Sequence, residues 1–386
     1  MPAPLRRVAD FVGTESAGGV ALVGATVAAI VWANIAGDSY RDFWSTQLTL
    51  PGPAHALALS EWVNEGLMAV FFFVVGLEIK REIVDGELRA PRTAAVPVVA
   101  ALGGMVVPAL IYALVNAGTT AGHGWGVPMA TDIAFAIGVL ALVGPRLPRG
   151  VGLTLLTLAI VDDLGAIAVI AIVYSAGISV EWLGVAIMGV VLVVVLRRVA
   201  EHPAWYAVPA VLIWIAMQRS GVHPTVAGVI VGFLTPLRTR SGYPILSVLE
   251  DRLHPWSSFL VVPLFALANA GIEVSVDRWQ ALTGSRLALG VVLGLAVGKV
   301  VGIVGGTWVA TRLGAQLPAG VTGRAMVAIG LLGGIGFTVS LFIAGLAFTG
   351  ADIGTAKLAI LVTSVAMALI STLWIRTIPP QTDPAT

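Results

Sequence analysis

The chain contains no cysteine, and only 11% of its 386 residues are charged. The absence of cysteine excludes disulfide bonds and thiolate metal sites. About a quarter of the residues in soluble domains are charged, so a chain this poor in charge is predicted to lie in a membrane. A net charge of +1 without a basic run also argues against nucleic acid as a partner.

Hydrophobic residues make up 58% of the chain, and the mean hydropathy is +0.95. A bilayer core of about 30 Å is crossed by roughly 20 helical residues. Apolar segments of this order recur and predict an all-α integral membrane protein with one transmembrane domain, residues 1–386. Twelve spans are predicted, at 17–36, 59–78, 94–117, 127–144, 151–175, 181–196, 204–218, 222–237, 256–272, 287–311, 325–349 and 355–375.

Lysine and arginine are divided unequally between the loops that these spans leave. The side that carries both termini holds 16 of the 22 basic residues, and Lys299 falls inside a span. The other side holds Arg41, Arg219, Arg278, Arg286 and Lys357. Because positive residues accumulate in cytoplasmic loops, both termini are predicted to be cytoplasmic.

Four ionisable residues remain deep inside the predicted spans: Asp132, Asp162, Asp163 and Lys299. A carboxylate at that depth costs at least about 2–3 kcal/mol and is seldom kept without a function. One acid can pair with Lys299 as a purely structural contact, but one cation cannot neutralise three acids. The excess acid predicts a proton or a mobile cation as partner. Adjacent helix positions differ by about 100°, so one acid of the Asp162–Asp163 pair can face a cavity while the other pairs with Lys299.

Two predicted spans contain dense glycine, which weakens a regular helix. The fourth begins with residues 122–128 (GHGWGVP), shortly before Thr131 and Asp132, and the eleventh contains residues 330–338 (GLLGGIGFT). Unwound backbone at membrane depth is tolerated where it is buried in protein or lines a wet cavity, and paired breaks in inverted repeats indicate an ion site. The alternative is that membrane helices are simply rich in glycine. In the tenth span, glycine at every fourth position from Gly290 to Gly306 predicts close helix packing beside Lys299.

Several motifs resemble the NhaA family of bacterial sodium/proton antiporters. They are residues 75–82 (VGLEIKRE), 130–136 (ATDIAFA), 160–167 (IVDDLGAI), 220–223 (SGVH), 254–256 (HPW), 263–270 (PLFALANA) and 334–338 (GIGFT). They follow one another in order over most of the chain, which makes a chance match implausible.

The resemblance implies a twelve-helix fold with inverted repeats at about 94–175 and 287–375, whose fourth and eleventh spans are interrupted and cross at mid-membrane. It implies that Asp163 is the main sodium or lithium ligand, with Asp162 beside it. Thr131 and Asp132 would lie at the crossing, and Lys299 would match the intramembrane lysine of the family. Protons and the cation would compete for the buried aspartates, without any cofactor, in electrogenic, sodium-exporting antiport.

The resemblance also implies a cytoplasmic pH-sensing cluster, formed by Glu78, Arg81, Glu82, Glu250 and His254. Asp251 stands where the resemblance leads us to expect a histidine, which predicts a different pH threshold. A bacterial cytoplasmic (inner) membrane location and a homodimer are implied too, the latter through an extracellular hairpin at about 45–58. The prolines of residues 48–53 (LTLPGP) leave an ordinary loop as the alternative there.

Two other functional classes fit the sequence less well. A magnesium enzyme with an Asp-Asp-x-x-Asp motif would need a third acid, but residues 164–166 (LGA) follow the Asp162–Asp163 pair. An intramembrane aspartic protease is disfavoured because its Gly-x-Gly-Asp arrangement is absent. A passive channel would be expected to repeat its filter residues around an axis, whereas this chain has one asymmetric set of acids. The chain is therefore predicted to be a secondary transporter and not an enzyme.

Overall fold

A computed structural model describes residues 3–49, 56–89, 91–143, 147–175, 177–199, 201–318 and 320–379. Within these ranges the fold is helical, apart from one pair of two-residue strands, β1 (Gln47–Leu48) and β2 (Leu57–Ala58). The strands pair antiparallel, with Gln47 opposite Ala58 and Leu48 opposite Leu57. They lie within the range predicted for a hairpin, while residues 50–55 between them lie outside the described residues.

The chain runs through the following elements in order. The first group is α1 (Ala3–Ile35), α2 (Gly37–Ser45), α3 (Leu59–Glu61), η1 (Trp62–Leu67), α4 (Met68–Val84), η2 (Glu87–Arg89), α5 (Pro91–Val115), η3 (Thr120–Met129), α6 (Ile133–Val143), α7 (Arg149–Val173) and α8 (Val180–Leu196). The second group is η4 (Pro203–Tyr206), α9 (Ala207–Ser220), α10 (Thr225–Leu234), α11 (Ile245–Trp256), η5 (Ser257–Val261), α12 (Val262–Asn269), α13 (Val276–Gly284), α14 (Arg286–Leu293), η6 (Gly294–Gly298), α15 (Lys299–Arg312), α16 (Gly323–Gly333), α17 (Phe337–Ala347) and α18 (Gly350–Arg376).

Five described helical segments are long and apolar enough to cross a membrane. They are Ala17–Ile35, Ala94–Val115, Gly150–Val173, Arg286–Arg312 and Gly350–Arg376. Two further helix pairs pass the same test together, η3 with α6 and α16 with α17, and each pair is bent by more than 40° at a short break. Other predicted spans consist of shorter consecutive elements, such as α11, η5 and α12. The chain is therefore an all-helical protein with several membrane-length apolar helices, while the count of twelve spans stays a prediction.

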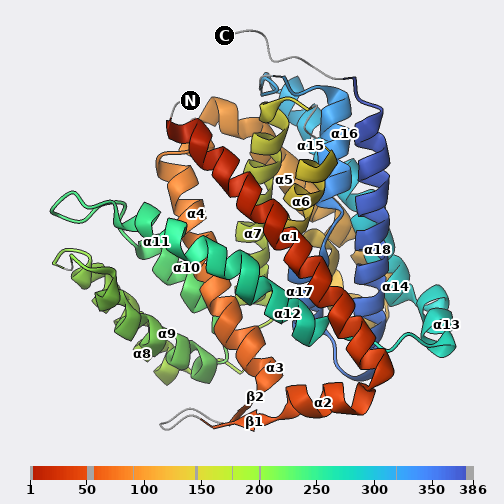
Figure 1. The fold of residues 1–386 in the computed structure, drawn as a ribbon, viewed down its shortest axis with the longest axis horizontal. Coiled ribbons are helices and arrows are strands. Elements are labelled where there is room, and N and C mark those ends of the chain that lie inside the picture. Colours follow the sequence, from red (N-terminus) through yellow and green to blue (C-terminus); the bar gives the residue numbers. More distant parts are fainter. Residues whose placement is uncertain are drawn as a thin grey trace.

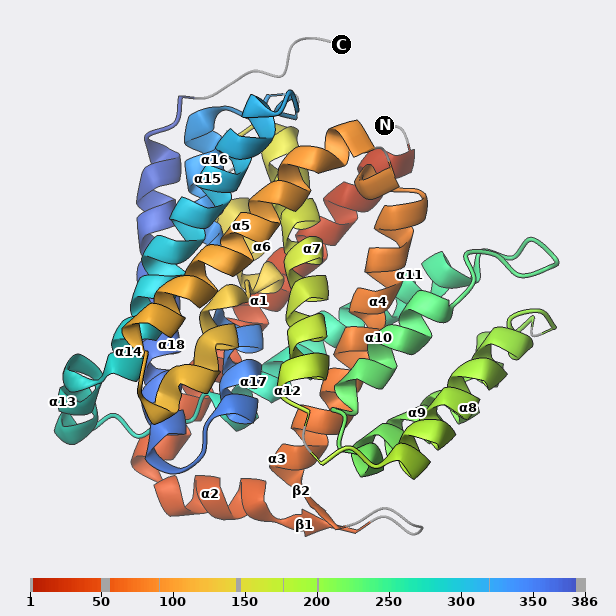
Figure 2. The same cartoon turned by 180° about the vertical axis from the view of Figure 1, so that it is seen from behind.

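The long helices form one bundle, and the α8–α9 pair stands at its side (Figure 1). α8 packs on α9, which in turn contacts α10. The start of α1 and the end of α18 lie at the same end of the bundle (Figure 1). α2 and the β1–β2 pair lie at the opposite end, and the view from behind shows the same arrangement (Figure 2).

Close helix packing joins α5 to α15 along the glycine stripe predicted in the tenth span. Gly302 of α15 lies against Gly103 of α5 so closely that a Cβ on either would collide with the backbone of the other. The stripe does not run through one regular helix, because η6 inserts a wide π turn directly before Lys299. There Gly294 and Gly298 pack against prolines of η3 and α5. This turn was not predicted, and it helps to set the direction in which Lys299 points.

Candidate functional site

A lysine and an aspartate form a buried ion pair in the middle of the bundle. Lys299 Nζ lies 2.6 Å from Asp162 Oδ2, and their side chains are 0% and 1% exposed. Lys299 Nζ also donates to the carbonyl oxygen of Met129, at the end of η3. Because no solvent reaches this pair, each charge depends on the other for compensation.

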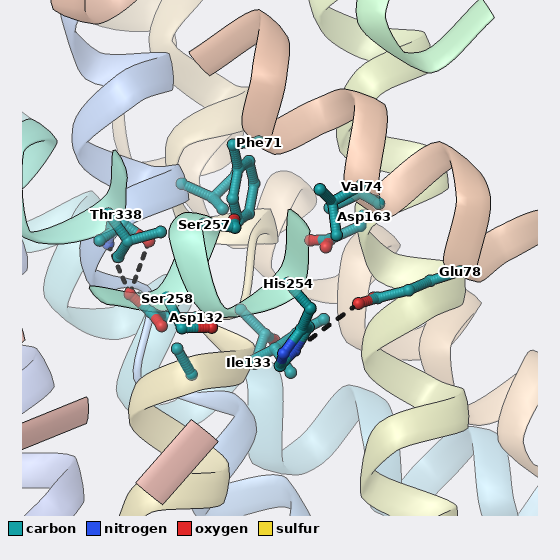
Figure 3. Close-up of a pocket in the computed structure, with 15 residues that line it drawn as sticks. Phe71, Val74, Glu78, Asp132, Ile133, Asp163, His254, Ser257, Ser258 and Thr338 are labelled. Atoms are coloured by element: carbon teal, nitrogen blue, oxygen red, sulfur yellow. Dashed lines mark hydrogen bonds and ion pairs between the residues drawn. The ribbon is translucent and has the colours of Figure 1, made fainter. Parts of the chain in front are cut away.

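The neighbouring acid, Asp163, is buried but lies on a different side of α7. It lines a cavity of about 40 Å³, which Asp162 and Lys299 do not line (Figure 3). Among the described residues, Asp163 Oδ2 has no hydrogen-bond partner. A void of about 10–15 Å³ on this measure admits one water molecule, so the cavity has room for a few. The two adjacent acids therefore meet different surroundings, as their helical positions require.

Asp132 lies where the two bent helix pairs cross. Its Oδ2 accepts hydrogen bonds from Thr338 N at 2.9 Å and from Thr338 Oγ1 at 2.6 Å. Its Oδ1 accepts from Phe135 N at 2.9 Å, and its own N–H donates to Ile335 O at 2.7 Å. One carboxylate thus caps the first turns of both α6 and α17.

Thr131 completes this crossing, because its Oγ1 donates to the carbonyl oxygen of Gly333 at 3.0 Å. The two bent helix pairs are therefore joined near their breaks by four hydrogen bonds that involve Thr131 and Asp132. Charges are also matched to helix ends: the Asp132 carboxylate meets helix N-termini, and the Lys299 ammonium meets the last carbonyl of η3. Both placements are electrostatically favourable.

The five residues predicted to form a pH-sensing cluster lie together at the ends of α4 and α11. Arg81 is ion-paired with Glu250, and its Nη2 lies 3.2 Å from Glu82 Oε1. His254 Nε2 lies 3.9 Å from Glu78 Oε1. Asp251 is exposed, and it makes none of the ion pairs of this cluster.

Glu78 and His254 connect this cluster with the buried acids. Both residues line the same cavity as Asp163, Asp132 and Thr131 (Figure 3). The sequence predicted the two groups separately and gave no reason to expect one shared cavity. The structure brings them together because α4, α7 and α11 each contribute a lining residue to the cavity, namely Glu78, Asp163 and His254.

Sequence reasoning did not include three polar residues that line this cavity, Thr338, Ser257 and Ser258. Thr338 belongs to the glycine-rich motif of the eleventh span, where only the helix break was considered. Ser257 and Ser258 lie in the π turn η5 inside an apolar stretch. Two adjacent buried serines in such a stretch were an available signal, because buried hydroxyls usually have a partner or line a polar space.

A resident metal centre finds no support among the described residues, since no group of three or more His, Asp or Glu side chains is gathered as metal ligands there. The oxygen atoms around the cavity belong instead to isolated carboxylates, hydroxyls and backbone carbonyls. These are hard ligands of the kind that alkali and alkaline-earth cations prefer.

Comparison with known proteins gives one consistent result. The family model described as Na+/H+ antiporter 1 matches residues 9–375. The Na(+)/H(+) antiporter NhaA of Escherichia coli O1:K1 / APEC is 45% identical over 384 residues, which cover 96% of this chain and 98% of that protein. The proteins of the same name from Escherichia coli strain K12 and from Shigella dysenteriae serotype 1 (strain Sd197) are 44% identical with the same coverage. The resemblance predicted from the motifs is confirmed.

Proposed function

The chain belongs to the Na+/H+ antiporter 1 family, and we propose that it exchanges sodium or lithium for protons across a membrane. In this proposal it is a secondary transporter that needs no cofactor, and the cations are its substrates. The proton gradient would drive sodium out of the cell.

The carboxylate of Asp163 is the single observation that carries this proposal. It is buried, it lines a cavity, and one of its oxygens has no partner among the described residues. The neighbouring Asp162 is already paired with Lys299. A buried carboxylate without a fixed cation requires a proton or a mobile cation to compensate its charge.

Exchange follows from competition at this carboxylate. A proton and a sodium ion each compensate the charge of Asp163, and both together would leave an excess positive charge in a poorly solvated site. Thr131, Asp132 and backbone carbonyls at the crossing offer further oxygens for a dehydrated alkali cation. If such a site opens to one side at a time, loading with a proton on one side and with sodium on the other produces antiport.

Two roles remain for Lys299 within this scheme. It can be a fixed counter-ion of Asp162 that holds α7 and α15 together, or it can release a proton when sodium disturbs that pair. In the second case more than one proton moves per sodium ion. Transport is then electrogenic, and the membrane potential contributes about 2.3 kcal/mol per net charge per 100 mV.

We also propose that the cluster of Glu78, Arg81, Glu82, Glu250 and His254 regulates exchange according to pH. The support is that two of its members, Glu78 and His254, line the cavity that Asp163 lines, so a change in the charge of the cluster alters the field in the cavity. Protonation of the cluster would then alter the access of a cation to the buried acid.

The remaining proposals concern placement in the membrane. Twelve spans, with inverted repeats at about 94–175 and 287–375, would put both termini in the cytoplasm of a bacterium, and the unequal distribution of basic residues supports this orientation. The start of α1 and the end of α18 lie at one end of the bundle, in agreement with it (Figure 1). The β1–β2 pair would then be extracellular, where a second copy could pair with it to form a homodimer.

The test uses purified protein in weakly buffered detergent solution with a pH indicator. Sodium or lithium is expected to release protons, and potassium at equal ionic strength serves as the control. The release should shrink as the pH falls, since protons then hold the site. Release that is independent of pH, or equal for all three cations, would refute competition at one carboxylate.

A further inference from the structure

Three basic residues converge on a second cavity at the end of the bundle that carries α2. The cavity has a volume of about 190 Å³, and its charged lining residues are Arg41, Arg278, Lys357 and Glu273. The three cations come from α2, α13 and α18, which are far apart in sequence. None of the residues that line this cavity also lines the cavity of Asp163.

The distribution of charge over the whole chain makes this convergence unusual. Only five basic residues are assigned to the predicted extracellular side: Arg41, Arg219, Arg278, Arg286 and Lys357. Three of the five line one cavity. Although the predicted extracellular side has few basic residues, most of them therefore lie around a single cavity.

One of the three cations is neutralised within the protein. Arg41 is ion-paired with Glu273, and its Nη2 lies 2.6 Å from Asp38 Oδ1. Hydrogen bonds to Asp38 and Glu273 raise the pKa of the Arg41 guanidinium, so it stays charged. Glu273, the only acid among the described residues that line the cavity, is thereby already paired.

The other two cations, Arg278 and Lys357, have no hydrogen-bond or ion-pair partner for their side chains in the described part of the chain. Both side chains are half-buried. Arg278 is held in position by packing, because its guanidinium lies so close to Gly354 of α18 that a Cβ there would collide with Nη1. The neighbouring acids Asp277 and Asp352 are exposed and do not line the cavity.

The surroundings place this cavity at the level of lipid headgroups in the proposed orientation. α2 lies across the end of the bundle (Figure 1). Trp32, Tyr40, Phe43 and Trp44 make successive ring contacts there, with centroids 5.1–6.4 Å apart. Aromatic residues are enriched where a membrane meets water.

From these observations we infer that Arg278 and Lys357 form a binding site for a phosphate group on the extracellular side of the protein. A guanidinium donates two parallel hydrogen bonds to phosphate oxygens, and a lysine ammonium adds a point charge. The positive end of the α18 helix dipole lies close by, since Ile353 and Gly354 line the cavity from its first turns. A phospholipid headgroup and free inorganic phosphate share this chemistry.

The experiment uses the delipidated full-length protein in detergent. Native mass spectrometry counts bound phosphatidylglycerol, with zwitterionic phosphatidylcholine for comparison, and a thermal-shift titration compares inorganic phosphate with chloride at equal ionic strength. Arg278→Gln and Lys357→Gln are each expected to weaken binding roughly tenfold, the effect of one lost charge-assisted hydrogen bond. Arg286→Gln is the matched control, because Arg286 is exposed on the same side and does not line the cavity.

Binding of phosphatidylglycerol without a response to phosphate would identify a lipid headgroup site, and the converse would identify a site for the free anion. Binding of both would show that the phosphate group alone suffices. Equal binding by wild type, Arg278→Gln and Lys357→Gln, or no preference for either phosphate-bearing probe over its control, would overturn the inference. A single symmetric peak in size-exclusion chromatography verifies that each variant is folded.

Discussion

The molecule holds two groups of charged residues, one at the crossing of the bent helices and one at the ends of α4 and α11, and they differ in their access to water. At the crossing of the bent helices, Lys299 and Asp162 are 0% and 1% exposed. At the ends of α4 and α11, the Arg81 and Glu82 side chains are 25% and 12% exposed, above the buried Glu78, Glu250 and His254 of the same cluster. At the crossing, each of these charges is compensated by one partner or by a helix end. In the cluster at the ends of α4 and α11, several acids surround one arginine, Arg81.

This difference in exposure suits the buried group to stabilising the fold and the more exposed group to regulation. A buried charge destabilises the folded protein unless a fixed partner compensates it. Most substitutions in the buried group are therefore expected to lower stability. Partly exposed ion pairs contribute little to stability, because water and salt screen them. Protons from the solvent reach the second group more easily, which suits it to respond to pH. Asp163 lies between the two groups and belongs to neither set of fixed pairs.

The largest effect is expected from Asp163→Asn. Asparagine has nearly the same shape but cannot ionise, so the site loses its competition between a proton and a cation. Exchange of sodium for protons in proteoliposomes should fall to the level of empty vesicles. The matched control is Asp277→Asn, an exposed acid outside the cavity, which should exchange normally. Normal exchange by Asp163→Asn would refute the site.

The buried Lys299–Asp162 ion pair can be removed by substituting either residue. Lys299→Gln and Asp162→Asn each leave one uncompensated buried charge, so each should lower the unfolding free energy by about 3–5 kcal/mol. The double variant removes both charges and should recover most of that loss, as measured by thermal unfolding in detergent. A double variant as unstable as the sum of the single changes would contradict the pairing. Proton release per sodium ion in the double variant then distinguishes the two roles of Lys299.

A smaller loss of stability is expected when the Thr338 hydroxyl group at the crossing is removed. Thr338→Val keeps the shape and the backbone N–H but removes the Oγ1 donor to Asp132. A hydrogen bond to a charged group contributes about 1.5–3 kcal/mol, so stability should fall by that amount. Thr363→Val is the matched control, because Thr363 Oγ1 is buried without a partner in the described part of the chain. Equal losses in both variants would show that the Asp132 contact contributes nothing specific.

The sequence predicted the members of both groups but not how they meet. Asp132, Asp162, Asp163 and Lys299 could be found because a charge in an apolar span is conspicuous against its neighbours. The different surroundings of Asp162 and Asp163 follow from helical geometry alone. The family resemblance supplied Glu78 and His254, which polarity at the end of a span would not have distinguished from ordinary helix-end residues.

Other features depend on contacts between distant segments, which composition and periodicity do not encode. The cavity shared by Asp163 and His254 arises because α4 packs against both α7 and α11. The role of Thr338 as a donor to Asp132 joins residues 206 positions apart. The π turn before Lys299 was hidden, because glycine at every fourth position fits a regular helix equally well.

The smallest effect should come from the cluster at the ends of α4 and α11, through Glu250→Gln. Glutamine still accepts a hydrogen bond from Arg81 but carries no charge, so Glu78 and Glu82 meet less repulsion and more of the field of Arg81. The cluster as a whole becomes less negative and holds a proton less strongly, so the pH of half-maximal exchange should move downward by about one unit or less. Maximal exchange at high pH and saturating sodium should stay at the wild-type level, since the buried acids are unchanged. Asp251→Asn removes the adjacent exposed charge, which has no ion pair in the cluster, and should leave the profile where it is. A profile that moves upward in Glu250→Gln, or moves equally in both variants, would mean that this cluster does not set the pH dependence.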